Sequence, residues 1–98
     1  MLYIINKSHA NSQALDQCLQ RASEGDAVLL IEHAVYSALD TKQTPLARLD
    51  RELDVFVLSP DMQTRGLEKT ECLGFIQYTD YQGFVELVAT NAVVRSCF

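Results

Sequence analysis

Several features that would point to a particular function are missing from this 98-residue chain. It has no tryptophan and only four glycines, and none of these makes a Gly-rich phosphate-binding loop. No apolar run approaches the roughly 20 residues that span a bilayer. The eight basic residues form no cluster and the net charge is −5, so we expect no direct nucleic-acid binding and no membrane attachment. The N-terminal residues resemble no secretory signal, which predicts a cytoplasmic protein.

Cysteine is also sparse, and its pattern limits the chemistry. The three cysteines, Cys18, Cys72 and Cys97, are far apart and form no Cys-x-x-Cys pair. A disulfide framework is therefore not expected, and each is either a small buried hydrophobe or a free thiol. There is no cluster of metal ligands and no nucleophile elbow, so we expect neither a metal nor an organic cofactor. A thiol is the only convincing nucleophile in the chain.

What the first half does contain is a regular alternation of predicted strands and helices. Residues 2–5 form a first strand, and Asn11 or Ser12 caps a helix that runs to about Ala22. Its apolar stripe consists of Leu15, Cys18, Leu19 and Ala22. The turn at residues 23–26 stops this helix, and Gly25 can take a left-handed conformation. Residues 27–31 predict a strand buried on both faces, followed by a short helix over 34–39 and a surface loop over 40–53 that is partly helical around 46–48.

The second half continues the pattern to an α/β fold. We expect a strand at 54–58, a brief helix with Ser59 as N-cap and Pro60 at its first position, and a strand at 74–78. Thr79 or Asp80 caps a last helix that closes near Asn91, and residues 92–94 add a short strand. The prediction is a single layered domain over residues 1–98, with a mostly parallel sheet of four to five strands and helices on both faces. The last helix presents a core or interface face of four residues: Tyr81, Phe84, Val85 and Val88.

In a parallel sheet, ligands bind beyond the carboxyl ends of the strands. The residues that follow the predicted strands there are polar, but none forms a phosphate cradle. They are Asn6-Lys7-Ser8, Glu32-His33, Ser59-Pro60-Asp61 and Thr79-Asp80.

Over nearly its whole length the chain resembles the DsrH/TusB family of small sulfur-relay subunits. The resemblance is carried by residues 2–8, Cys18-Leu19, the turn at 23–26, residues 58–61 followed by 65–67, and residues 78–81. None of these segments is specific alone, but their order and spacing are typical of the family. The family often ends in Trp or Trp-Leu, whereas this sequence has Ser96-Cys97-Phe98, which keeps an aromatic residue and adds a thiol.

This resemblance implies a DsrE-like fold and a role in passing persulfide sulfur. It implies a heterohexamer with paralogous DsrE/TusD-like and DsrF/TusC-like subunits, and a small sulfur acceptor of the TusE/DsrC kind. In the Tus branch the sulfur reaches 2-thiouridine at the tRNA wobble position, and in the Dsr branch it belongs to sulfur oxidation. Tus-type members can lack a cysteine in the first helix, whereas Dsr-type members carry one at the position of Cys18.

Two interpretations of Cys18 therefore stand side by side. It is either a persulfide carrier or a core cysteine of a non-catalytic subunit that stabilises a catalytic paralogue and its docking surface. For His33, His9, Cys72 and Cys97 the structural interpretation is favoured: surface or capping histidines, a structural thiol beside Glu71, and an incidental thiol near the end of the sequence. A free-standing small-molecule binding domain is the weakest hypothesis, because no site for one is visible.

Overall fold

The computed structural model describes all 98 residues, which form strands, α-helices and 3-10 helices (η) in alternation. Their bounds in chain order are β1 (Leu2–Ile5), α1 (Ala14–Arg21), β2 (Ala27–Leu30), η1 (Glu32–Ala38), η2 (Pro45–Arg48), β3 (Asp54–Leu58), α2 (Ser59–Thr64), η3 (Lys69–Glu71), β4 (Gln77–Thr79), α3 (Tyr81–Thr90) and β5 (Val94–Cys97).

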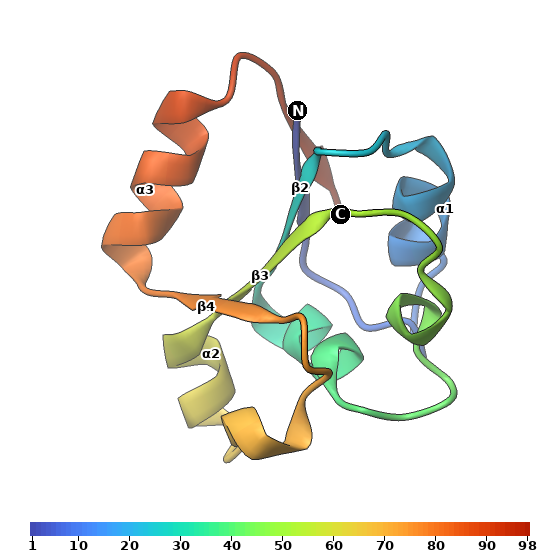
Figure 1. The fold of residues 1–98 in the computed structure, drawn as a ribbon. Coiled ribbons are helices and arrows are strands. Elements are labelled where there is room, and N and C mark those ends of the chain that lie inside the picture. The colour runs from blue at the N-terminus through green and yellow to red at the C-terminus, as the bar shows by residue number, and fades with distance from the viewer.

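The strands form one five-stranded sheet in the order β4-β3-β2-β1-β5, and all neighbouring strands are parallel. Helices lie on both faces, with α1 on one side of the sheet and α3 on the other (Figure 1). The predicted parallel α/β layer fold is therefore confirmed. The last strand β5 pairs with the first strand β1, so the first and last segments of the sequence lie side by side, with β5 at one edge of the sheet.

The two faces of the sheet carry cores of different size. On the α1 face, alternate strand residues such as Ile5, Leu30 and Val57 pack with Leu15 and Cys18 into a cluster of 17 buried residues. The opposite face holds 6 buried residues, against which Phe84 and Leu87 of α3 pack. The main hydrophobic stabilisation therefore lies on the α1 face, where η1, η2 and α2 also contribute buried residues, and the α3 face is less completely covered.

The helix α3 has more apolar surface than the sheet can cover. None of its residues is buried, although Phe84 and Leu87 are half-buried against the sheet. Tyr81 and Val85 are 60% and 66% exposed, and Val88 is also exposed. The expected face of Tyr81, Phe84, Val85 and Val88 thus divides into one residue that packs on the sheet and three that point to solvent. Residues 81, 85 and 88 lie on one helix face, which we call the outer stripe of α3.

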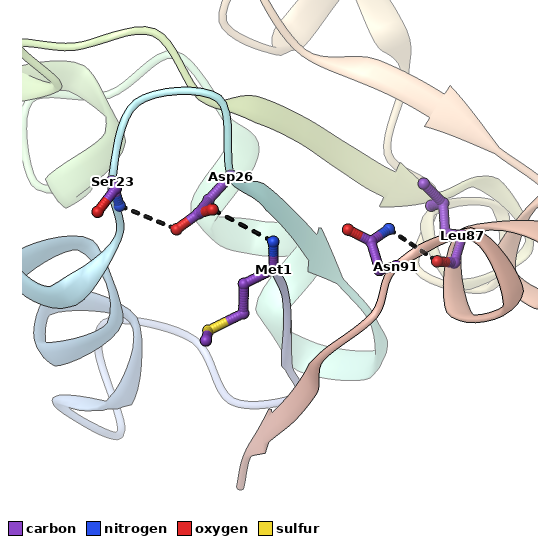
Figure 2. A network of polar contacts seen from close by, with 5 residues as sticks. All are labelled: Met1, Ser23, Asp26, Leu87 and Asn91. Carbon is purple, nitrogen blue, oxygen red and sulfur yellow. Dashed lines mark hydrogen bonds and ion pairs between the residues drawn. The ribbon is translucent and has the colours of Figure 1, made fainter.

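Local polar contacts explain where several elements begin and end. Gly25 has a φ of +89°, as expected for the turn that follows α1. In the same turn, the carboxylate of Asp26 accepts hydrogen bonds from the Ser23 N–H at 2.9 Å and from the Met1 amino group at 3.2 Å (Figure 2). The side-chain amide of Asn91 donates to the Leu87 carbonyl at 2.8 Å and closes α3.

Five predicted boundaries were wrong by one to three residues or in type. The N-cap of α1 is Gln13 rather than Asn11 or Ser12. Ser59 is the first residue of α2 rather than its N-cap, which is Leu58. The fourth strand is β4 at Gln77–Thr79, not 74–78, and the fifth begins only at Val94. The helix after β2 is a 3-10 helix over residues 32–38. The predicted surface loop also contains buried anchors, because Thr44 is fully buried and its hydroxyl donates to the Ser37 carbonyl at 2.6 Å.

Candidate functional site

Cys18 lies in the middle of α1, on the stripe that faces the sheet. It is 2% exposed and belongs to the large core cluster together with its stripe neighbours Leu15 and Leu19. The predicted stripe is confirmed. In this conformation a bulky sulfur donor has no direct access to the Cys18 sulfur.

A second thiol lies beside Cys18, and it comes from the other end of the sequence. Cys97 pairs in register with Ile5, which points toward α1, and neighbours in a parallel register share a face of the sheet. Its half-buried side chain packs against the cluster that contains Cys18. The neighbouring Cys97 contributes to the raised pKa of Cys18.

A surface hollow of about 380 Å³ opens over this pair of thiols. Two basic side chains line it, Arg21 from the last turn of α1 and Arg95 from β5. Neither forms an ion pair or a hydrogen bond within the chain, so both guanidinium groups remain available to an anion. Of the four hollows on the molecule, this is the only one lined by a cysteine. We call it the thiol hollow; it is lined by residues 14, 17, 18, 21 and 95–98.

The electrostatics of the thiol hollow distinguish its two sulfurs. Burial raises the pKa of the Cys18 thiol to about 12, and negative charge on Cys97 acts in the same direction. Asp26 adds to this shift, and Arg21 opposes it. Since the thiolate is the nucleophile, Cys18 is held as a neutral thiol near neutral pH. A neutral Cys18 thiol beside Cys97 can donate its S–H to the neighbouring sulfur.

The residues predicted at the carboxyl edge of the sheet form a separate polar cluster. Glu32 has a φ of +51°, an unusual value for a residue other than glycine, and its N–H donates to the Asp61 carboxylate at 2.6 Å. Arg65 donates to the Asp61 carbonyl at 3.0 Å and approaches Nδ1 of His33 at 3.3 Å. The exposed ring of His33 also lies 6.1 Å from that of Tyr36. This cluster contains no thiol, and its hydrogen bonds fix the start of η1.

The first loop, which contains His9, is held by a fully buried serine. The Nδ1 atom of His9 lies 2.8 Å from the Ser37 hydroxyl oxygen, which also accepts the His9 N–H at 3.0 Å. Because Ser37 is fully buried, this Ser–His pair offers no accessible nucleophile. His9 therefore holds the loop after β1 against η1.

Cys72 lies away from the thiol hollow and is buried. Its sulfur donates to the Glu68 carbonyl at 3.8 Å, and burial, followed by the charge of Glu71, raises its pKa. The adjacent Tyr78 has a pKa raised to about 12 by burial and by the neighbouring Cys72. The effect of Glu71 on Cys72 thus has the predicted direction, although burial is the larger cause.

The structure contains no group of three or more His, Cys, Asp or Glu side chains that could hold a metal ion. None of its helices has the length and apolar character required to cross a bilayer.

This fold is shared by solved structures, two of which we describe. The crystal structure of the ychN protein from E. coli superposes with a TM-score of 0.72, covers 97% of both chains and is 14% identical. The solution structure of protein Tm0979 from Thermotoga maritima gives a TM-score of 0.67 at 19% identity, over 91% of this chain and 92% of that one. These likenesses establish the class of the molecule, a small parallel α/β layer protein.

The sequence comparisons narrow this class to one family. The family described as "DsrH like protein" matches residues 7–94. The chain is also 30% identical to Protein TusB of Pectobacterium parmentieri over 91 residues, which is 93% of this chain and 94% of the relative. The chain therefore belongs to the DsrH family, as the sequence motifs indicated.

Proposed function

We propose that this chain is a subunit of a cytoplasmic sulfur-relay complex. In that complex persulfide sulfur passes toward 2-thiolation of the tRNA wobble uridine, or is used in Dsr-type sulfur oxidation. The observation that carries the proposal is the match to the DsrH family over residues 7–94. A relative named TusB that aligns over 93% of the chain supports the same assignment, and the single domain that we propose spans residues 1–98.

The uncovered apolar surface of α3 supports a role as one subunit of an assembly. Tyr81, Val85 and Val88 form an exposed outer stripe on a helix whose inner side already packs on the sheet. Adjacent exposed apolar residues of this kind are typical of protein interfaces. The partners we propose are paralogous DsrE/TusD-like and DsrF/TusC-like subunits in a heterohexamer, with a TusE/DsrC-like acceptor.

Cys18 is the candidate persulfide carrier of the chain. The chemistry is attack by its thiolate on the outer sulfur of a persulfide, which needs neither a metal nor an organic cofactor. Its position beneath the thiol hollow, next to Arg21, supports this role. Its burial and raised pKa require that the thiol be reached through another group or after a partner has docked.

The same burial favours a second candidate function. With 2% exposure, Cys18 also fits a purely structural subunit that has no turnover and stabilises a catalytic paralogue together with its docking surface. In that case the apolar stripe of α3 is the functional feature of the chain, and its thiols take no part in the relay.

Co-expression with the paralogous subunits tests the proposal and separates the two candidates. We expect a stable complex that delivers sulfur from a cysteine desulfurase to the acceptor protein, as measured by intact-mass spectrometry. Sulfur delivery that is lost in Cys18→Ser but kept in Cys72→Ser supports the carrier role. Delivery unchanged in Cys18→Ser, but abolished when the chain is omitted, supports the structural role. Absence of any complex and of any effect on delivery refutes both.

A further inference from the structure

We propose that Cys97 is the first sulfur acceptor of this chain and that it passes the sulfur to Cys18 within the thiol hollow. The inference rests on the proposed relay function and deepens it, because it provides a route by which sulfur reaches a buried thiol. It assigns a role to a residue whose sequence context indicated only an incidental thiol.

The strand register brings the two sulfurs together. β5 pairs with β1 so that Cys97 lies opposite Ile5 and Arg95 lies opposite Tyr3, on the face covered by α1. Tyr3 lies near the same groups. Burial is the main cause of its raised pKa, Cys18 and Cys97 add to the shift, and Arg95 opposes it. Both cysteines therefore line one hollow.

Access to solvent differs between the two thiols. Cys18 is 2% exposed, whereas Cys97 is only half-buried and lies on an edge strand whose other three residues are exposed. A donor that enters the thiol hollow therefore meets the Cys97 sulfur first. A volume of about 380 Å³ leaves room for a small sulfur donor, or for the tip of a partner segment that bears a persulfide.

The charges around the thiol hollow favour this chemistry. Arg21 and Arg95 line it without any internal ion pair, so their guanidinium groups can stabilise an anionic sulfur. Asp16 on α1 is also exposed, but it lines a different hollow.

Two balanced steps describe the transfer. In the first, the Cys97 thiolate attacks the outer sulfur of a donor persulfide R–S–SH, the donor S–S bond breaks, and R–S⁻ leaves and takes up a proton from solvent. In the second, the Cys18 sulfur attacks the outer sulfur of Cys97–S–SH while its proton passes to the departing Cys97 sulfur. The products are Cys18–S–SH and Cys97–SH. No net oxidation or reduction occurs in either step, and no other co-reactant is consumed.

The test exposes the full-length chain to inorganic polysulfide and locates the added sulfur, about 32 Da, by peptide-mapped mass spectrometry over time. In the wild-type chain we expect the label on Cys97 first and on Cys18 later. Cys97→Ser should slow the labelling of Cys18 on the order of a hundredfold, because direct attack on the donor then depends on a buried neutral thiol. Cys72→Ser is the matched control and should change neither rate.

A converse variant keeps the test sharp. Cys18→Ala should retain the label on Cys97 and let it accumulate there. The variant Cys97→Ser changes a half-buried edge residue, so circular dichroism should show an intact fold. The order in which Cys97 and Cys18 are labelled is measured in the wild-type chain and does not depend on any variant. Labelling of Cys18 before Cys97, labelling of neither, or labelling of Cys18 in Cys97→Ser at the wild-type rate overturns the proposal. None of these measurements requires sulfur delivery to an acceptor. Failure of this inference is therefore distinguishable from failure of the proposed function.

Discussion

The thiol of Cys18 on α1 and the thiol of Cys97 on β5 line the same surface hollow, although the two residues come from opposite ends of the sequence. The contact exists because β5 joins the sheet beside β1 and directs Cys97 toward α1. One thiol is thereby held neutral in the core, and the other is placed between it and solvent. This asymmetry is the basis of the first prediction.

Alkylation of Cys18 should depend on pH over the whole accessible alkaline range. Its pKa is raised from 9.0 to about 12, so its thiolate fraction should rise about tenfold per pH unit from pH 7 to well above pH 10 without a plateau. Iodoacetamide labelling mapped by mass spectrometry in the folded chain measures this. A plateau near pH 9 would show an ordinary, accessible thiol and contradict the structure. The urea-unfolded chain, in which the shift is lost, provides the control.

Asp26 should stabilise the fold at neutral pH and lose this effect in acid. Chiefly because the Ser23 N–H donates to its carboxylate, the pKa of Asp26 lies below its ordinary value of 3.8. The stabilisation is therefore present above about pH 4 and disappears as the pH falls through the lowered pKa. Asp26→Ala should reduce the free energy of unfolding at pH 7 by about 1–2 kcal/mol, measured by urea denaturation.

The control for Asp26 is Asp50→Ala. Asp50 pairs with Arg51 at 2.8 Å, but its side chain is 82% exposed, so its loss should change stability by less than about 0.5 kcal/mol. Equal effects of the two substitutions, or an effect of Asp26→Ala that persists undiminished at pH 2, would refute this account of the turn.

Gly83 should resist substitution because of one neighbouring side chain. A Cβ atom at Gly83 would collide with the Thr79 hydroxyl, next to the Asp80 cap that accepts the Gly83 N–H at 2.8 Å. Gly83→Ala should therefore destabilise the chain by about 1–2 kcal/mol, despite the higher helix propensity of alanine. Adding Thr79→Ala should remove most of this loss, whereas Gly74→Ala, which meets open space, should be nearly neutral. Thermal unfolding of these three variants and the wild type tests whether the loss arises from that contact.

Two adjacent residues of α3 should respond in opposite ways. Val85 is 66% exposed, so Val85→Asp should leave the free energy of unfolding within about 0.5 kcal/mol of wild type but weaken association with the proposed partner subunits. Phe84 packs on the sheet, and Phe84→Ala should destabilise the chain itself by about 1–3 kcal/mol. Denaturant unfolding and co-purification measure the two effects. Unimpaired association of Val85→Asp would exclude the outer stripe of α3 as an interface.

Much of the fold was predictable because the strong local signals agree with the tertiary structure. The apolar runs at residues 2–5 and 27–31, Gly25 and the Asp80 cap all have the expected roles. The errors occurred where tertiary pairing sets the boundary. β4 and β5 are short edge strands, and their limits depend on which residues reach the register of β3 and β1. The 3-10 helix at residues 32–38 follows from the left-handed backbone at Glu32, which Asp61 holds from a distant segment.

The candidate site was predictable only in part. The helical stripe placed Cys18 correctly, since periodicity is a local property. The contact with Cys97 depends on the position and register of the last strand, and neither is encoded near Cys97. Arg95 was not identified for the same reason. One signal was present in the final segment. Cys97 lies two residues after Arg95, which places both side chains on one face of a strand, but that face can be assigned only once β5 is known to pair with β1.

The most direct test of the central claim is sulfur delivery in a reconstituted system of desulfurase, paralogous subunits, this chain and the acceptor protein. Intact-mass spectrometry of the acceptor follows the gain of about 32 Da. The account predicts rapid delivery with the wild-type chain and little delivery when the chain is omitted. Delivery at the same rate with and without the chain would contradict its role as a sulfur-relay subunit.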